Sequence, residues 1–179
     1  GVTLVQLREK NLSKEEFVAE AKAVLALCRQ YGVPLIINDR LDVALESGAD
    51  GVHVGIEDAP VSEIRRQTGP DFIIGATAKT VAQAQAAQAA GADYLGVGAV
   101  FPSPTKRNAI RITSEVLREI CGSVSIPAVA IGGITEENAS SLRGCGMAGI
   151  AVVSAIFGAA DITQAGAGLR TLAESITAP

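Results

Sequence analysis

The sequence predicts an α/β fold, a (β/α)8 TIM barrel, formed as a single domain by residues 1–179. Strand-like runs and helical patterns alternate along the chain without a linker, a charge block or a low-complexity segment. Nearly every strand-like run also ends in a small cluster of polar residues or glycines. Because a β/α barrel builds its active site at the carboxyl ends of parallel strands, we expect these clusters to hold the functional residues.

The strand pattern indicates a parallel sheet. Seven strands are expected, near residues 2–8, 34–38, 51–54, 72–76, 93–98, 127–131 and 150–153. Residues 35–37 and 150–153 are apolar throughout, which is typical of parallel strands buried on both faces. A doubly wound sheet also accommodates seven strands, but no GxGxxG phosphate loop follows the first one. A closed barrel has eight β/α units, one for each strand. We therefore expect this chain to hold units 2–8 and the natural protein to carry the first unit, roughly 20–30 further residues, upstream.

The helices are predicted from caps and apolar spacing. Ser13 and Glu16 form a capping box, and Gly32 marks the end of the helix that follows. Further helices are expected near residues 41–47, 60–68, 79–90, 113–121, 136–145 and 161–176. An internal echo supports the array, because GADGVHVG at 48–55 resembles GADYLGVG at 91–98. Each copy is interpreted as a helix end, a turn and a strand.

Composition narrows the function classes. The chain is 48% hydrophobic with a net charge of -4, which fits one domain with a sizeable core and argues against nucleic acid or a membrane as partner. No apolar run approaches the ~20 residues of a membrane span, and we expect no signal peptide and a cytoplasmic location. The three cysteines lack CxxC spacing and are interpreted as reduced thiols. A homo-oligomer is left open.

The first polar cluster follows the first predicted strand. Alternate residues of a strand point to one side, so Gln6, Arg8 and Lys10 share a side while Val5 and Leu7 face the other. Three donors in a row, two of them cationic, make a cradle for an anion such as phosphate. The solvated face of an edge strand explains this cluster equally well.

Two carboxylates follow the next two predicted strands. Asp39 and Asp58 come just past neighbouring strands, and Mg²⁺ is typically held by one or two carboxylates, waters and substrate phosphates. The alternative is that both residues serve helix starts, Asp39 as a cap and Asp58 for the helix dipole. The metal interpretation gains from the cationic cluster beside it.

Later clusters also suit phosphate. Residues 101–106 (FPSPTK) place two hydroxyls and an ammonium on a short loop. Gly132, Gly133 and Ser154 end the last two strands, where β/α barrels often bind phosphate through backbone N–H groups. His53 is the single histidine, and its place inside a buried strand indicates a packing residue rather than an acid–base group.

Together the motifs resemble the thiamine-phosphate synthase family. The resemblance spans essentially the whole chain and rests on motifs in the family order: QLREK at 6–10, INDR at 37–40, GVHVG at 51–55 with Asp58, FPSPTK at 101–106, AIGGI at 130–134 and AVVSAI at 151–156. It implies a transferase that condenses a hydroxymethylpyrimidine diphosphate with a thiazole phosphate to thiamine phosphate and releases pyrophosphate. A thiazole tautomerase-like isomerase and a non-catalytic phosphate-binding barrel are the alternatives.

The resemblance also implies roles for individual residues. Asp39 and Asp58 would hold Mg²⁺, and the catalytic groups would be Arg8, Lys10, Thr77 and Lys106. The substrate-binding residues implied are Gln6, Leu7, Arg8, Glu9, Lys10, Asn38, Thr77, Ser103, Pro104, Thr105, Lys106, Gly133, Val153 and Ser154. The chain departs from the family pattern at three positions, where Ile56 replaces a common glutamine, Thr77 a serine and Lys79 a histidine.

Overall fold

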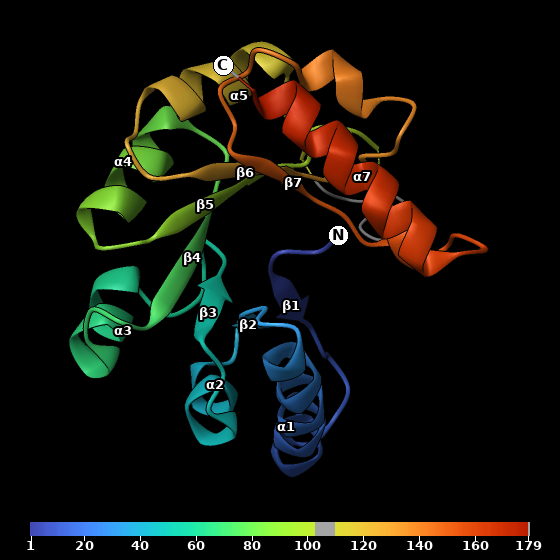
Figure 1. Ribbon diagram of the computed structural model, residues 1–179. Coiled ribbons are helices and arrows are strands. Elements are labelled where there is room, and N and C mark those ends of the chain that lie inside the picture. The colour runs from blue at the N-terminus through green and yellow to red at the C-terminus, as the bar shows by residue number, and fades with distance from the viewer. Residues whose placement is uncertain (103–109, 179) are drawn as a thin grey trace. The chain divides into compact units, whose positions relative to one another are not determined.

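The computed structural model describes residues 1–102 and 110–178 (Figure 1). The chain divides into two compact units. The N-terminal unit comprises residues 2–76 and 90–93, and the C-terminal unit comprises residue 1, residues 77–89 and residues 94–179. The expectation of a single domain stays a prediction. In the described part of the chain, no helix combines the length and apolar character needed to cross a membrane.

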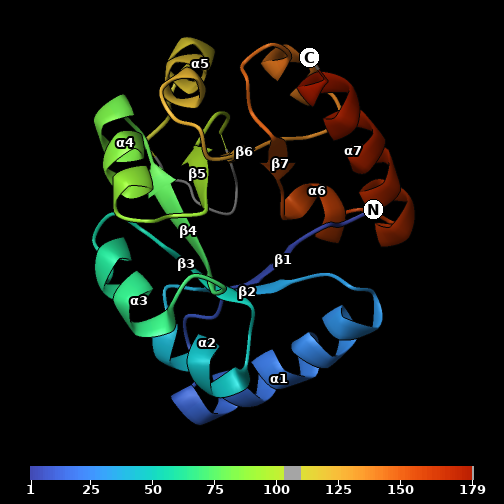
Figure 2. The same ribbon diagram turned by 60° about the vertical axis from the view of Figure 1, so that its left-hand side comes forward.

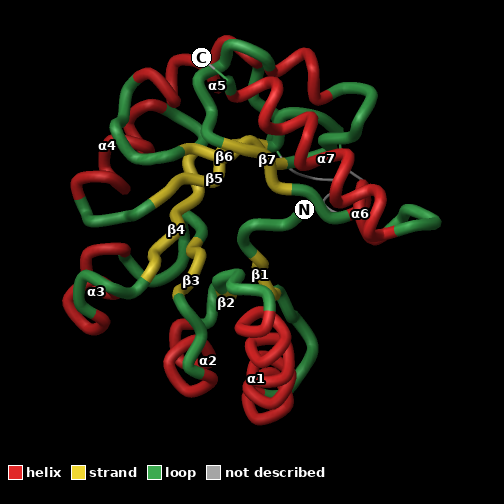
Figure 3. The backbone as a smooth tube through the Cα atoms, in the orientation of Figure 1, coloured by secondary structure: helices red, strands yellow, loops and turns green. Residues whose placement is uncertain are grey.

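The N-terminal unit alternates strands and helices. Its strands are β1 (Val5–Leu7), β2 (Leu35–Asn38), β3 (Gly51–Val54) and β4 (Ile73–Ala78), the last of which ends in the other unit. They pair in parallel in chain order, with Val5 opposite Leu35, Ile36 opposite Gly51, and Gly51 opposite Ile73. The helices α1 (Lys14–Gln30), α2 (Leu41–Ser47) and α3 (Val61–Thr68) lie between them in sequence, as the colours of Figure 3 show.

The first helix forms as its sequence predicts. The Ser13 hydroxyl accepts the Glu16 N–H at 3.2 Å, and the Glu16 carboxylate accepts the Ser13 N–H at 2.9 Å, which completes the capping box. The buried face of α1 carries Phe17 and Ala21, which join the core that β2 and β3 supply through Leu35, Ile37 and Val52. This core fixes the strands whose ends carry the polar clusters.

The C-terminal unit repeats the alternation. Its strands β5 (Tyr94–Gly98), β6 (Ala128–Ile131) and β7 (Gly149–Ala151) pair in parallel, with Leu95 opposite Ala128 and Val129 opposite Gly149. Its helices are α4 (Val81–Ala89), α5 (Ser114–Gly122), α6 (Ser154–Phe157) and α7 (Ile162–Thr177), with a 3-10 turn at Ala139–Leu142. Figure 2 shows α7, which contacts β7, α6 and the 3-10 turn.

Two predicted elements are shorter in the structure, and one short helix was not predicted. The helix expected at 136–145 is only the 3-10 turn, because the Asn138 side chain accepts the Thr135 N–H and donates to the Gly133 carbonyl, each at 2.9 Å. These bonds satisfy backbone groups outside a helix. The strand expected at 2–8 is limited to Val5–Leu7, the residues that pair with β2. The short helix α6 was not expected, since four residues carry too little periodicity to reveal it.

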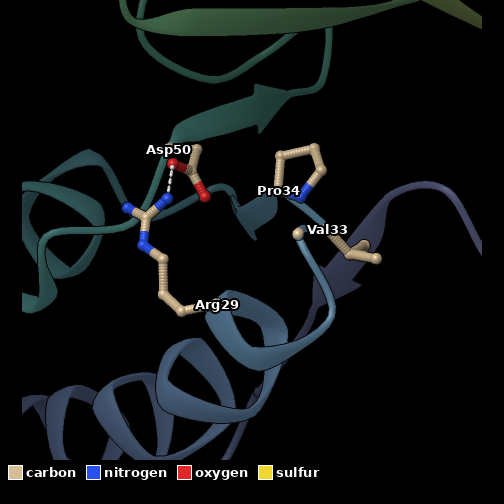
Figure 4. A pocket seen from close by; sticks show the side chains of 5 residues that line it. Arg29, Val33, Pro34 and Asp50 are labelled. Carbon is tan, nitrogen blue, oxygen red and sulfur yellow. Dashed lines mark ion pairs between the residues drawn. The ribbon is translucent and has the colours of Figure 1, made fainter.

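The internal echo has a physical basis at the amino ends of the strands. Asp50 accepts the Leu35 N–H at 2.8 Å and pairs with Arg29 at 2.8 Å. Figure 4 shows this ion pair at the rim of a pocket that Val33 and Pro34 also line. Each aspartate of the echo thus joins the start of one strand to an arginine of the preceding helix.

The second copy of this contact, which we call the aspartate–arginine clamp, contains more hydrogen bonds. Asp93 accepts the Ile74 N–H at 2.7 Å and pairs with Arg65 at 2.6 Å. The Arg65 guanidinium also donates to the carbonyls of Gly69 and Phe72, each at 2.7 Å, and to that of Gly91 at 2.8 Å. One largely buried side chain therefore binds three backbone carbonyls of the N-terminal unit.

We expect Asp93→Ala to lower the free energy of unfolding by about 2–3 kcal/mol, because it leaves a largely buried guanidinium and a strand N–H without their carboxylate. Urea unfolding would measure the change. The matched control is Glu174→Ala, which breaks the exposed Arg170–Glu174 pair on α7 and should lower stability by about 0.5 kcal/mol or less. Equal losses of unfolding free energy in the two variants would contradict a stabilising role for the Arg65–Asp93 clamp.

Candidate active site

The cationic cluster lies at the carboxyl end of β1. Gln6, Arg8 and Lys10 are exposed, whereas Val5 and Leu7 pack against the core, so the predicted sidedness is confirmed. Arg8 and Lys10 follow the last strand residue, Leu7. The two cationic side chains therefore stand past the strand end with room to meet a ligand.

Asp39 is fixed at the carboxyl end of β2. It is the non-glycine residue with a positive φ in the described backbone, at 63°, a conformation that aspartate tolerates better than most residues. Its N–H donates to the His53 carbonyl at 2.8 Å, which ties the turn to β3. Its carboxylate accepts the Lys10 ammonium at 3.1 Å. The N-cap of α2 is Arg40, which makes no side-chain capping bond, so Asp39 does not cap this helix.

Asp58 folds back onto the end of β3. Its carboxylate accepts the Gly55 N–H at 2.6 Å, and its own N–H donates to the Gly55 carbonyl at 3.3 Å. The following helix α3 has Pro60 at its N-cap. The carboxylate is thus engaged with the strand end rather than with the helix, which favours the ligand interpretation over the helix-dipole alternative.

The two carboxylates suit Mg²⁺ held jointly with a phosphate. Among residues 1–102 and 110–178, no group of three or more His, Cys, Asp or Glu side chains could hold a metal ion alone. Mg²⁺ commonly uses one or two carboxylates and takes its other ligands from water and substrate phosphates. Asp39 and Asp58 occupy neighbouring strand ends of the N-terminal unit, and the Lys10 ammonium already shows that Asp39 accepts a cation. The donor set fits the ion.

His53 is buried within β3, with 9% of its surface exposed. Burial lowers its pKa to about 4, and the nearby negative charge of Asp39 only partly offsets this effect. The imidazole is therefore neutral at pH 7. This agrees with the interpretation of His53 as a packing residue, and its carbonyl contributes by anchoring Asp39.

The sign of the His53 shift predicts how stability depends on pH. The folded pKa lies below the unfolded value, so stability is complete above pH ~6.5 and is lost as the pH falls toward ~4. Between about pH 7.5 and about pH 5, the wild type should lose about 2 kcal/mol more unfolding free energy than His53→Gln. Urea unfolding in EDTA measures both. Parallel pH profiles for the two proteins would contradict the prediction.

Asn38 is the last residue of β2 and Glu9 lies just past β1, both in the N-terminal unit, whereas Thr77, Gly133, Val153 and Ser154 belong to the C-terminal unit. Gly133 follows β6 with φ 63°, and a Cβ there would lie 2.1 Å from the Pro102 carbonyl oxygen, so only glycine allows this approach. Val153 is the N-cap of α6, which begins at Ser154, three residues after the last residue of β7. Thr77 is the penultimate residue of β4. Ser103, Pro104, Thr105 and Lys106 lie outside the described residues.

Sequence reasoning missed two features of this site. The left-handed backbone of Asp39 had only a weak signal, an Asn-Asp pair directly after a strand. The pairing of Lys10 with Asp39 had none, since the residues are 29 positions apart. The strand ends thus carry exposed cations beside two carboxylates, a donor set that suits a metal together with a polyphosphate.

Comparisons with known proteins agree on one family. The family model of thiamine monophosphate synthase matches residues 1–156. Thiamine-phosphate synthase 2 of Streptococcus pneumoniae is 52% identical over 162 residues, 90% of this chain and 77% of the relative. The thiamine-phosphate synthase of Clostridium tetani is 48% identical over 165 residues, 92% of this chain and 79% of the relative.

A solved structure confirms the predicted fold class. The thiamine phosphate pyrophosphorylase of Pyrococcus furiosus is 42% identical to this chain, and the match has a TM-score of 0.91. It covers 99% of this chain and 86% of the other. The parallel strands and helices of this chain thus belong to the same α/β fold class as that protein.

Proposed function

Since the chain belongs to the thiamine monophosphate synthase family, we propose that it joins a hydroxymethylpyrimidine diphosphate to a thiazole phosphate, giving thiamine phosphate and pyrophosphate. It is then a transferase of thiamine biosynthesis. The observation that carries the proposal is the cluster at the ends of β1, β2 and β3, where Lys10 meets Asp39 and Asp58 folds back onto Gly55. This combination of cations and carboxylates suits a metal-bound diphosphate.

The N-terminal unit supplies the groups for the diphosphate. Arg8 would grip phosphate oxygens through its planar fork and Lys10 as a point charge, with Gln6 and Asn38 as neutral partners. Asp39 and Asp58 would hold Mg²⁺, which when bound neutralises charge that develops on the departing pyrophosphate. All these side chains belong to segments at or just past the carboxyl ends of β1, β2 and β3.

The chemistry needs positioning and charge more than proton transfer. The bond between the pyrimidine methylene and the diphosphate oxygen breaks, and the electron pair leaves with pyrophosphate. The thiazole nitrogen then donates its lone pair to the methylene carbon and becomes the positive nitrogen of thiamine. No proton is exchanged in these steps, so a neutral buried His53 and a surface of fixed cations agree with them.

The C-terminal unit supplies the groups for the thiazole phosphate. Gly133 presents backbone after β6, and Val153 and Ser154 begin the short helix α6 after β7. In β/α barrels the last two strand ends often hold phosphate this way. Ser103, Pro104 and Thr105 would add to this group, and Thr77 and Lys106 would serve the pyrimidine and the diphosphate. These roles follow from the family motifs.

Turnover should require Mg²⁺ and both carboxylates. We expect pyrophosphate release only when both substrates and Mg²⁺ are present, and a higher Mg²⁺ requirement, by about 10-fold or more, in Asp39→Asn and Asp58→Asn. A coupled pyrophosphate assay measures this. Asp42→Asn is the control, because Asp42 pairs with Arg40 on α2. Isomerisation of the thiazole phosphate without any pyrophosphate release would instead support the tautomerase alternative.

Lys106 should act on the departing charge. We expect Lys106→Ala to lower kcat by about 10²-fold while thiazole phosphate binding changes much less, since the ammonium would matter most as pyrophosphate leaves. Steady-state kinetics with both substrates separates the two effects. Lys22→Ala, at an exposed position of α1, is the control. A raised thiazole KM with unchanged kcat would remove Lys106 from this role.

A further inference from the structure

The ion pair between Lys10 and Asp39 links two residues that the proposed function assigns to different ligands. The ammonium lies 3.1 Å from the carboxylate. Arg40, the sequence neighbour of Asp39, is not its partner, because two hydrogen bonds of 2.8 and 2.7 Å hold it to Asp42. Among the described ion pairs, Lys10 therefore supplies the cation at Asp39.

The two partners differ in backbone restraint and in side-chain exposure. Asp39 has a left-handed backbone and an N–H bond to His53, and its side chain is 29% exposed. Lys10 lies past the end of β1 on a flexible four-carbon stem, and its side chain is 53% exposed. The carboxylate is thus a fixed point, whereas the ammonium can leave it at little cost.

We propose that Lys10 is an exchangeable counter-ion that keeps free divalent cations from Asp39 and moves to the diphosphate when metal and diphosphate arrive together. This inference rests on the proposed function. A free dication must displace the ammonium and tolerate its charge nearby. A metal–diphosphate chelate brings new anionic partners for the ammonium. The ligand favoured at these strand ends is therefore the chelate rather than the bare metal.

In this role, Lys10 opposes binding of the bare metal and favours binding of the metal–diphosphate chelate. Removing its charge should strengthen binding of the bare metal and weaken binding of the chelate. A purely structural lysine would not change the two affinities in opposite directions. Reciprocal coupling of this kind is what an exchange of partners requires.

The experiment measures Mn²⁺ binding by electron paramagnetic resonance on the whole chain, without and with pyrophosphate. We expect Lys10→Met to lower the Kd for Mn²⁺ alone by about 3- to 10-fold and to raise the Kd for Mn²⁺–pyrophosphate by a similar factor. Lys10→Arg should resemble the wild type. The gain should shrink at about 1 M salt, where charges are screened.

Two controls locate the effect. Lys14→Met removes an exposed lysine paired with Glu46 at 2.8 Å and should leave both Kd values unchanged. Adding Asp39→Asn to Lys10→Met should abolish the gain in Mn²⁺ affinity. If Lys10→Met binds Mn²⁺ no more tightly than the wild type, or if no protein binds Mn²⁺ at all, the inference is wrong.

The outcome is independent of turnover. A shift of the two Kd values in opposite directions without any pyrophosphate release in the coupled assay would support the counter-ion role and reject the proposed reaction. Turnover that requires Asp39, together with unchanged Kd values in Lys10→Met, would support the reaction and reject the counter-ion role.

Discussion

The parallel register of β1, β2 and β3 is the constraint on which the candidate site in the N-terminal unit depends. Val5 pairs with Leu35 and Ile36 with Gly51, so successive strands end at one edge. Residues far apart in sequence, such as Lys10 and Asp39, meet there only because that register is kept. A one-residue shift between parallel strands would turn each side chain to the opposite face. The register in turn depends on apolar residues of β2 and β3 that pack against α1.

The amino ends of β2 and β4 serve stability. Arg29–Asp50 and Arg65–Asp93 join strand starts to the preceding helices, and both aspartates also accept a strand N–H. Their bonds are directed at backbone, which leaves little freedom for chemistry. At the carboxyl ends, the polar groups instead include exposed cations and a carboxylate with a mobile partner. In the N-terminal unit, fixed polar groups thus lie at the amino ends of strands, and exchangeable polar groups lie at the carboxyl ends.

Local patterns predicted much of this chain from its sequence. The capping box at Ser13 and Glu16, the bounds of β3 and the sidedness of the Gln6 cluster needed only neighbouring residues. The partner of Asp39 was out of reach, because it depends on strand register and on a choice between Lys10 and Arg40 that is made in three dimensions. The helix predicted at 136–145 was wrong for a related reason. One side chain there replaces the backbone bonds that helical periodicity would have predicted.

The left-handed backbone of Asp39 has a consequence for inherited variation. Glycine and asparagine also accept this conformation, and each differs from aspartate by a single base in the genetic code. The commonest mutational neighbours at this position therefore keep the turn and the fold while they remove the negative charge. Such alleles would yield a folded protein that escapes cellular quality control. Loss of function at this position would then come from the missing carboxylate in a folded protein rather than from degradation.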